Sequence, residues 1–281
     1  MRARRGNAPA ATLMAISIAA LVGLTLALRA LSRADATGLA PIELYCAAGV
    51  RPPVAGAVRR FTEETGQPVR IQYGGSGALL AAIQLSGRGD LYIAADDSYV
   101  RTAEDRGLIF TSVPLATLTP VIAVPAGNAK NVRTLDDLLR KDVTFAMANP
   151  SVAAVGQVTK EVLQAHGLWA QLAERCRVFK PTVNEIAADV RLGTVDAAII
   201  WDATAAQTNG IEAVSVPQFE NIVRTIEAGV LASSTQPEAA LELARYLAAS
   251  DRGGTWFDQL GYGPIERQPW RPDRPADGGG P

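Results

Sequence analysis

The sequence predicts an α/β protein built as two lobes, each with a mixed, mostly parallel sheet and crossover helices. Short apolar runs alternate with amphipathic helical segments from residue 42 onward, as in strands joined by helices. The alternation restarts at about Leu118, where a new apolar strand runs to Val124. A late strand at 222–231 and a helix opened by Pro237 have room to return to the first lobe, which would make two hinge crossings.

The elements before the restart are defined by apolar periodicity and by proline and glycine at helix ends. Pro52 opens the first helix and Gly66 closes it, and Asp96 and Asp97 are expected to cap the helix at 98–106. The expected strands are 42–47, 69–73 and 91–93, and the expected helices are 52–65, 77–85 and 98–106.

The second lobe repeats this alternation. Thr134 and Asp137 resemble a capping box for a helix that runs through Leu139. The expected strands are 118–124, 143–147, 177–179 and 197–201, and the other expected helices are 155–166 and 184–192.

The N-terminal segment has the composition of a targeting sequence. Three arginines in the first five residues precede an apolar run at 8–28, and Ala34-Asp35-Ala36 supplies a small-residue cleavage pattern. The run is also close to the roughly 20 residues that a membrane helix needs, so an uncleaved anchor is the alternative. In either case we expect the rest of the chain to work in the periplasm or at the extracytoplasmic face of the membrane.

These patterns divide the chain into four parts. We expect a signal peptide or anchor at 1–36, lobe I at 37–119 and 226–265, and lobe II at 120–225. The final part, 266–281, is rich in proline, glycine, arginine and aspartate, and we expect it to be disordered.

Composition excludes several classes of function. The formal net charge of −1 gives no basic field, so nucleic acid is not expected as a partner. Cys46 and Cys176 lie too far apart in sequence to indicate a disulfide, and we expect ordinary buried thiols. The single histidine, His166, stands at a predicted helix end with no nucleophile motif or metal-ligand spacing around it, so we expect neither an enzyme nor a resident cofactor.

Four loops of small residues join strands to helices and are the candidate binding elements. They are "CAAGVRPP" after the first strand, "YGGSGALL" after the second, "ANPSVAAVGQ" at 148–157 and "KPTVNE" at 180–185. A helix start presents unpaired N–H groups and the positive end of the helix dipole, so it attracts anions. Ser76 adds a hydroxyl beside the N–H groups of Gly77 and Ala78.

Each of these loops also has a simpler interpretation as a turn. "GGSGALL" is not a phosphate loop because no Gly-Lys-Ser/Thr follows it, and Leu80 occupies the third small position of a dinucleotide loop. Arg51 could reach an anion near Gly49 or remain solvated on the first helical turn. Only the four loops together indicate a site for a compact oxyanion.

The order of the motifs resembles that of the periplasmic molybdate-binding proteins, the solute-binding components of molybdate/tungstate ABC transporters. The first half shares a strand ending in two alanines, a helix closing in F-x-x-E-T-G, a strand ending in YG-x-SGAL, and GDLYIAAD. Later, "KEVLQAHGLW", "VRLGTVDAAIIW" and "PEAALELARYLAASDRGGTWFDQLGYG" match the family's second-lobe and C-terminal segments. The resemblance covers about residues 42–263.

This resemblance implies a type II periplasmic-binding-protein fold whose two lobes close over an oxyanion held by neutral donors. Ser76 matches the family's second-loop serine, and Val155 and Val183 match backbone donors at the starts of two helices. Two positions depart from the family pattern: Gly49 replaces a serine, and Trp201 replaces a tyrosine. The first change loses a hydroxyl, and the second exchanges a phenol for an indole N–H.

The function that the resemblance implies is capture of molybdate or tungstate by a monomer that delivers it to an inner-membrane ABC permease. The metal would be held only as the centre of the oxyanion, through Gly49, Ser76, Gly77, Val155, Val183 and Trp201. The alternatives are sulfate, phosphate with Asp202 or Glu185 as acceptor, ferric iron, or a membrane-tethered ligand sensor.

Overall fold

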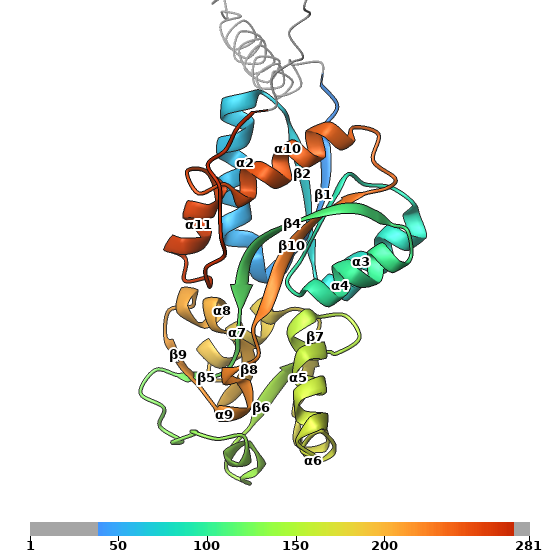
Figure 1. The fold of residues 1–281 in the computed structure, drawn as a ribbon. Coiled ribbons are helices and arrows are strands. Elements are labelled where there is room, and N and C mark those ends of the chain that lie inside the picture. The colour runs from blue at the N-terminus through green and yellow to red at the C-terminus, as the bar shows by residue number, and fades with distance from the viewer. Residues whose placement is uncertain (1–38, 273–281) are drawn as a thin grey trace, which may run out of the picture.

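The computed structural model describes residues 39–272, and they form two α/β lobes stacked end to end (Figure 1). Each lobe contains one five-stranded sheet, with the order β2-β1-β3-β10-β4 in lobe I and β7-β6-β8-β5-β9 in lobe II. The predicted fold class is therefore confirmed: both sheets are mixed, and both carry crossover helices.

In lobe I the first three strands are parallel and the last two are antiparallel to their neighbours. β1 pairs in parallel with β2 and β3, whereas β10 runs antiparallel to β3 and β4. The strands are β1 (Ile42–Ala47), β2 (Val69–Gly74), β3 (Leu91–Ala94), β4 (Ile109–Leu118) and β10 (Arg224–Leu231). The helices are η2 (Ala48–Val50), α2 (Arg51–Thr65), α3 (Ser76–Ser86), α4 (Asp97–Asp105), α10 (Pro237–Ala248) and α11 (Gly253–Gln259).

Lobe II repeats this arrangement. β6 is parallel to β7 and β8, and β5 runs antiparallel to β8 and β9. The strands are β5 (Pro120–Pro125), β6 (Phe145–Ala148), β7 (Val178–Lys180), β8 (Ala197–Trp201) and β9 (Ile211–Val214). The helices are η3 (Asp136–Leu139), α5 (Ala154–Ala165), α6 (Trp169–Arg175), α7 (Val183–Arg191), α8 (Asp202–Gln207) and α9 (Pro217–Glu220).

Local sequence accounts for most helix boundaries. Proline occupies the first turn of α2, and Gly66 ends that helix in the left-handed conformation with φ +75°. Asp96 caps α4 by accepting a hydrogen bond from the Ser98 N–H. His166 ends α5, as expected, with its Nδ1 2.8 Å from the carbonyl oxygen of Val162. β3 and β8 are buried along their whole length, which is typical of strands covered by helices on both faces.

The chain crosses between the lobes at two adjacent points. The first crossing is at Thr119, between β4 and β5, and the second follows α9 and ends at Arg224, the first residue of β10. Arg224 pairs with Leu118 across the sheet, so the two crossings lie side by side. Two neighbouring strand ends therefore form the hinge about which the lobes can open and close.

β4 is a strand that sequence periodicity did not predict. Its register with β10 passes from Ala116 directly to Pro114, so Leu115 is an extra residue in a β-bulge. Proline is tolerated there because β4 is an edge strand. The carbonyl oxygen of Leu115 accepts a hydrogen bond of 3.0 Å from Arg267 Nη2, which satisfies the bulge.

Residues 266–272, which we expected to be disordered, lie against lobe I. The ring of Trp270 meets that of Tyr246 edge to face, with 5.1 Å between the centroids, and the Arg252 guanidinium lies 5.4 Å from the Trp270 ring centroid. The Trp270 N–H donates to Asp251 Oδ1 at 2.8 Å. Packing onto lobe I, which composition does not encode, holds this segment. The predicted signal or anchor at 1–36 and residues 273–281 fall outside the described residues.

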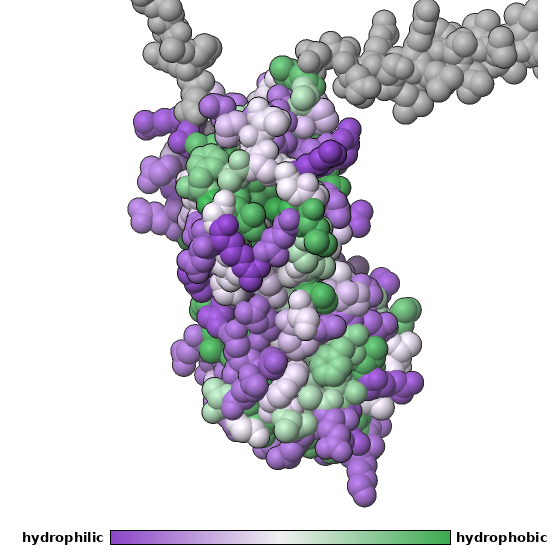
Figure 2. Space-filling view, turned by 90° about the vertical axis from the view of Figure 1, so that its right-hand side faces the viewer, coloured by the Kyte–Doolittle hydropathy of each residue, from purple (hydrophilic) through white to green (hydrophobic). Residues whose placement is uncertain are grey.

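The surface of both lobes is mixed in character. On the face shown in Figure 2, hydrophilic side chains form most of the outline, and apolar side chains gather in the middle of lobe I. Within residues 39–272, no helix combines the length and the apolar character needed to cross a membrane.

The two cysteines provide a simple test of the fold. Both are free: Cys46 is buried in β1, and Cys176 is half-buried at the end of α6. Burial raises the pKa of the Cys46 thiol far above its usual range, and the thiolate is the reactive form. We expect two thiols to titrate with Ellman's reagent after unfolding without reductant, and Cys46 to stay unreactive in the native protein. Recovery of fewer than two thiols from the unfolded chain would contradict this arrangement.

Candidate functional site

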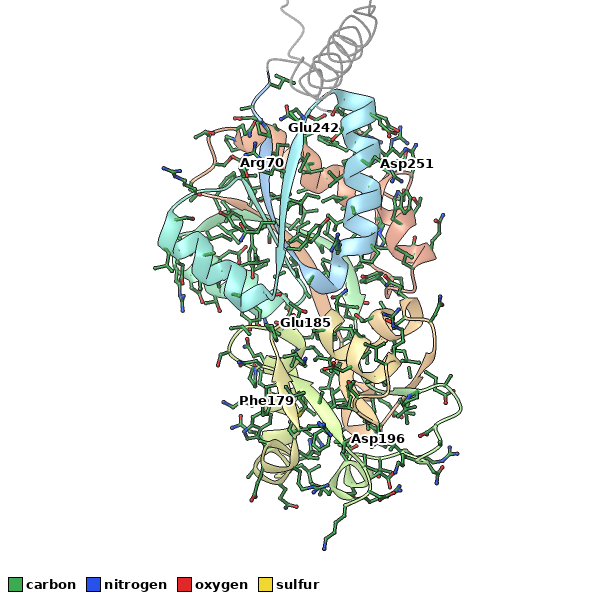
Figure 3. All side chains as sticks on the ribbon, turned by 180° about the vertical axis from the view of Figure 1, so that it is seen from behind. Arg70, Phe179, Glu185, Asp196, Glu242 and Asp251 are labelled. Atoms are coloured by element: carbon green, nitrogen blue, oxygen red, sulfur yellow. The ribbon has the colours of Figure 1, made fainter. Side chains whose placement is uncertain are left out.

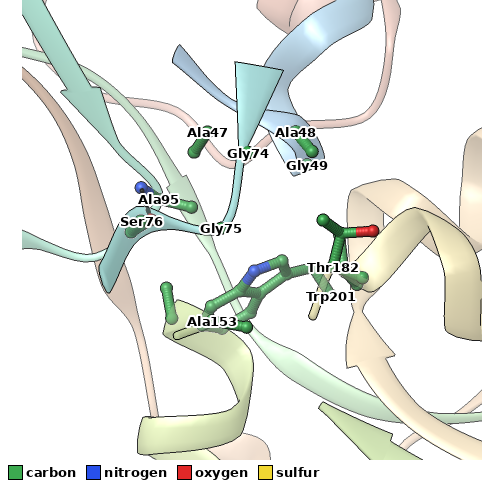
Figure 4. A pocket seen from close by; sticks show the side chains of 12 residues that line it. Ala47, Ala48, Gly49, Gly74, Gly75, Ser76, Ala95, Ala153, Thr182 and Trp201 are labelled. Carbon is green, nitrogen blue, oxygen red and sulfur yellow. Dashed lines mark hydrogen bonds between the residues drawn. The ribbon is translucent and has the colours of Figure 1, made fainter. Parts of the chain in front are cut away.

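A small cavity lies between the lobes, where the strand–helix loops of both lobes converge (Figure 4). Its volume is about 20 Å³, which exceeds the roughly 10–15 Å³ that one water needs but is far below the roughly 300 Å³ of the smallest drug-sized pockets. Only a compact ligand fits. The residues that line it are Ala47, Ala48, Gly49, Gly74, Gly75, Ser76, Ala95, Ala153, Ala154, Thr182, Val183 and Trp201.

Helix starts form most of the cavity wall. η2, which leads into α2, begins there with α3, α5 and α7, so two helix starts come from each lobe. The first N–H groups of a helix have no partner within it, and they carry the positive end of its dipole. No charged side chain of the described chain lines the cavity. The wall is therefore neutral but rich in donors, an environment that favours an anion.

Ser76 contributes a side-chain donor to this wall. The residue is buried at the start of α3, and its Oγ accepts a hydrogen bond of 3.2 Å from the Ala95 N–H. Its carbonyl oxygen accepts another, of 2.8 Å, from the Tyr92 hydroxyl. Because the Oγ is held as an acceptor on the lobe I side, its own proton remains available for a ligand.

Trp201 and Gly49 share one region of the cavity. Trp201 ends β8 and is buried, and Figure 4 shows its indole nitrogen directed into the space enclosed by the labelled residues. A Cβ added at Gly49 would lie 3.0 Å from Val183 Cγ1 and 3.6 Å from Trp201 Cδ1. The indole and Val183 thus fill the room that a side chain at position 49 would need. The two departures from the family pattern are therefore sterically linked.

The glycine that precedes Ser76 is required by an approach between the lobes. Gly75 has φ −69° and ψ 144°, a conformation that any residue adopts. A Cβ at this position would overlap the carbonyl oxygen of Val152 and lie 2.7 Å from that of Pro181, both in lobe II. Gly75 is thus explained by the proximity of lobe II and not by conformational freedom.

Two of the six predicted ligand residues, Gly77 and Val155, are not among the residues that line the cavity. The Gly77 N–H donates to the carbonyl oxygen of Val152 at 3.0 Å, so in this conformation it joins the lobes and does not face a ligand. Val155 is the second residue of α5, directly after Ala154, which does line the cavity. The structure brings the other four, Gly49, Ser76, Val183 and Trp201, together around one cavity.

Thr182 is a lining residue that the sequence reasoning did not select. It caps α7: its Oγ1 accepts from the Glu185 N–H at 3.4 Å and donates to the Glu185 carboxylate at 2.7 Å. Glu185 lies where the two lobes meet (Figure 3). The T-V-N-E pattern is a capping box, so the sequence contained the signal that places Thr182 at the start of this helix.

Comparison with known proteins places this geometry in a family. The family model described as bacterial extracellular solute-binding protein matches residues 42–263. The chain belongs to this family. Its members bind solutes outside the cytoplasm, so the cavity between the lobes is a solute-binding site.

Individual relatives agree with this assignment. The molybdate-binding protein ModA of Mycobacterium bovis is 26% identical over 231 residues, which cover 80% of this chain and 85% of that protein. The solved periplasmic molybdate-binding protein of Azotobacter vinelandii superposes with a TM-score of 0.68 at 17% identity, over 80% of this chain and all of that one. The sulfate-binding protein SubI of Mycobacterium tuberculosis gives 0.70 at 18% identity, over 80% and 87%. At these identities, the two structural likenesses show the fold alone.

Gly75→Ala tests whether the lobes must approach this closely. The backbone conformation accepts alanine, so we expect the unliganded variant to unfold near the wild-type temperature. The added methyl group would block closure, and we expect ligand affinity to fall at least tenfold by calorimetry, with a larger radius of gyration in X-ray scattering.

Gly107→Ala provides the opposite control. Gly107 has φ +68° with open space around it, so the substitution strains lobe I without touching the cleft. We expect lower thermal stability and unchanged affinity. Wild-type affinity in Gly75→Ala would contradict the close approach.

Proposed function

We propose that this solute-binding protein captures molybdate or tungstate outside the cytoplasm and delivers it, as a monomer without a resident cofactor, to an inner-membrane ABC permease. The observation that carries the proposal is the small neutral cavity at four helix starts, with the Ser76 hydroxyl and the Trp201 indole N–H as side-chain donors. Binding makes and breaks no covalent bond. The printed names of the ModA relatives support the choice of molybdate.

The donors favour a fully deprotonated oxyanion. Phosphate keeps a proton at neutral pH and needs an acceptor such as a carboxylate. Asp202 and Glu185, the two acceptors considered from the sequence, do not line the cavity. Asp202 accepts from the Ala203 N–H at 2.7 Å, and Glu185 is engaged with Thr182. The absence of a carboxylate from the described lining therefore disfavours phosphate and leaves sulfate as the rival anion.

Ferric iron fits this lining poorly. Iron(III) prefers carboxylate and phenolate oxygens, whereas the corresponding position of the wall is Trp201, an indole. Within residues 39–272, no three histidine, cysteine, aspartate or glutamate side chains come together as a metal site. The remaining alternative, a membrane-tethered sensor, depends on residues 1–36, which lie outside the described chain.

A panel of anions tests the proposal directly. Molybdate, tungstate, sulfate and phosphate would each be titrated into the protein by calorimetry and in thermal unfolding. We expect molybdate and tungstate to bind and to raise the unfolding temperature through preferential binding to the folded state. Tight binding of sulfate or phosphate with no response to molybdate would overturn the choice of ligand.

Ser76→Ala tests the side-chain donor. Removing a donor to a charged ligand costs about 1.5–3 kcal/mol, so we expect molybdate affinity to fall about ten- to a hundredfold. Ser86→Ala, at the exposed far end of the same helix, is the matched control and should bind like the wild type. Thermal unfolding shows whether loss of the Ala95 hydrogen bond also affects folding. Unchanged affinity in a folded Ser76→Ala variant would remove Ser76 from the site.

A further inference from the structure

We propose that Arg224 is a positioning residue that holds the two lobes closed, by joining Asp96 of lobe I to Glu161 of lobe II. The inference rests on the proposed function only for the choice of ligand in one of its tests. It assigns a role in closure to side chains that do not line the cavity.

Arg224 stands at the hinge itself. It is the first residue of β10, directly after the second crossing, and it pairs with Leu118, the last residue of β4 before the first crossing. Its backbone therefore belongs to the lobe I sheet, while its side chain is placed to contact both lobes. A residue at this point senses the angle between the lobes more directly than a residue on an outer helix does.

The lobe I side of the contact is buried and permanent. Asp96 is almost fully buried, and its Oδ1 accepts from the Ser98 N–H at 2.8 Å. Its Oδ2 lies 3.0 Å from Arg224 Nε but makes no well-aligned hydrogen bond within the described chain, so this half is a charge pair. Burial raises the pKa of the Asp96 carboxyl, and the nearby Arg224 charge acts in the opposite direction.

The position of Asp96 explains why this charge must be balanced. Asp96 follows Ala95, which lines the cavity and donates its N–H to Ser76. An uncompensated carboxylate at this place would repel an anion in the cavity and would be costly to bury. The Arg224 guanidinium supplies the opposite charge from behind the wall, so the cavity itself stays neutral.

The lobe II side of the contact is weak and reversible. Arg224 Nη2 lies 3.4 Å from Glu161 Oε2, and the Glu161 side chain is 48% exposed. Glu161 is on α5, the helix whose start lines the cavity, so it moves with the ligand-binding part of lobe II. Opening the lobes separates this pair but leaves Asp96 and Arg224 together, and the Glu161 contact therefore exists only in the closed state.

Other contacts also cross between the lobes and limit the expected effect. The N–H groups of Gly77 and Ala78 donate to the Val152 carbonyl oxygen, and Gln207 Nε2 donates to that of Leu260 at 3.0 Å. Partly exposed ion pairs contribute little each, so we expect loss of the Glu161 contact to shift the closed-to-open ratio about two- to fivefold. The shift should disappear in about 1 M salt, where such pairs are screened.

Glu161→Gln is the decisive variant because it is nearly isosteric and leaves lobe I unchanged. Spin labels at Leu85→Cys in lobe I and Leu192→Cys in lobe II, both exposed in the wild type, would report the distance between the lobes in a Cys176→Ser background. We expect more open protein without ligand, and tungstate dissociation faster by the same factor. Glu174→Gln, an exposed glutamate on α6 of the same lobe, is the matched control and should change neither.

Variants of Arg224 separate closure from folding. Arg224→Gln leaves Asp96 buried without its partner, so we expect both lower thermal stability and more open protein. The double variant Asp96→Asn/Arg224→Gln removes the buried charge, and it should recover stability while remaining as open as Glu161→Gln. Recovery of both properties together would assign Arg224 to folding alone and overturn the proposal.

The label distances in the unliganded protein test this inference whatever anion binds. If wild-type protein ignored tungstate, the proposed ligand would be wrong, but the ratio of closed to open protein would still be measured. Indistinguishable distance distributions for wild type, Glu161→Gln and Glu174→Gln at low salt would refute the role of Arg224 in closure.

Discussion

The two lobes meet through backbone atoms at the loop before α3, and the binding cavity depends on how closely they approach there. The Gly77 and Ala78 N–H groups donate to the Val152 carbonyl oxygen, and Gly75 leaves no side chain between this loop and lobe II. At this separation the helix starts of both lobes face one enclosed space. A wider gap would admit water to the same N–H groups and weaken their combined field at a bound ion.

The electrostatic arrangement follows from that enclosure. The wall uses partial charges only, from helix starts, a serine hydroxyl and an indole N–H. The full charges of Asp96 and Arg224 lie behind it and cancel each other. A compact dianion is thus bound by fixed dipoles that need no reorganisation, while selectivity rests on the size of the space that Gly49, Val183 and Trp201 leave between them.

The sequence predicted what local patterns encode and missed what depends on distance through space. Alternating periodicity predicted the α/β fold, which the structure confirms, and the small-residue loops predicted Gly49, Ser76, Val183 and Trp201, which meet at one cavity. The strand β4 escaped prediction because Pro114 and a bulge interrupt its alternation. The engagement of Gly77 by Val152 and the packing of Trp270 on Tyr246 join residues far apart in sequence, and no local pattern announces them.

A crystal structure of the protein grown with tungstate tests the central claim most directly, because tungsten is located by its anomalous scattering without reference to any model of the site. The account predicts one strong anomalous peak between the lobes, with tungstate oxygens within hydrogen-bonding distance of Ser76 Oγ, the Trp201 indole nitrogen and helix-start N–H groups of both lobes. A peak outside this cavity, or none at saturating tungstate, would contradict it.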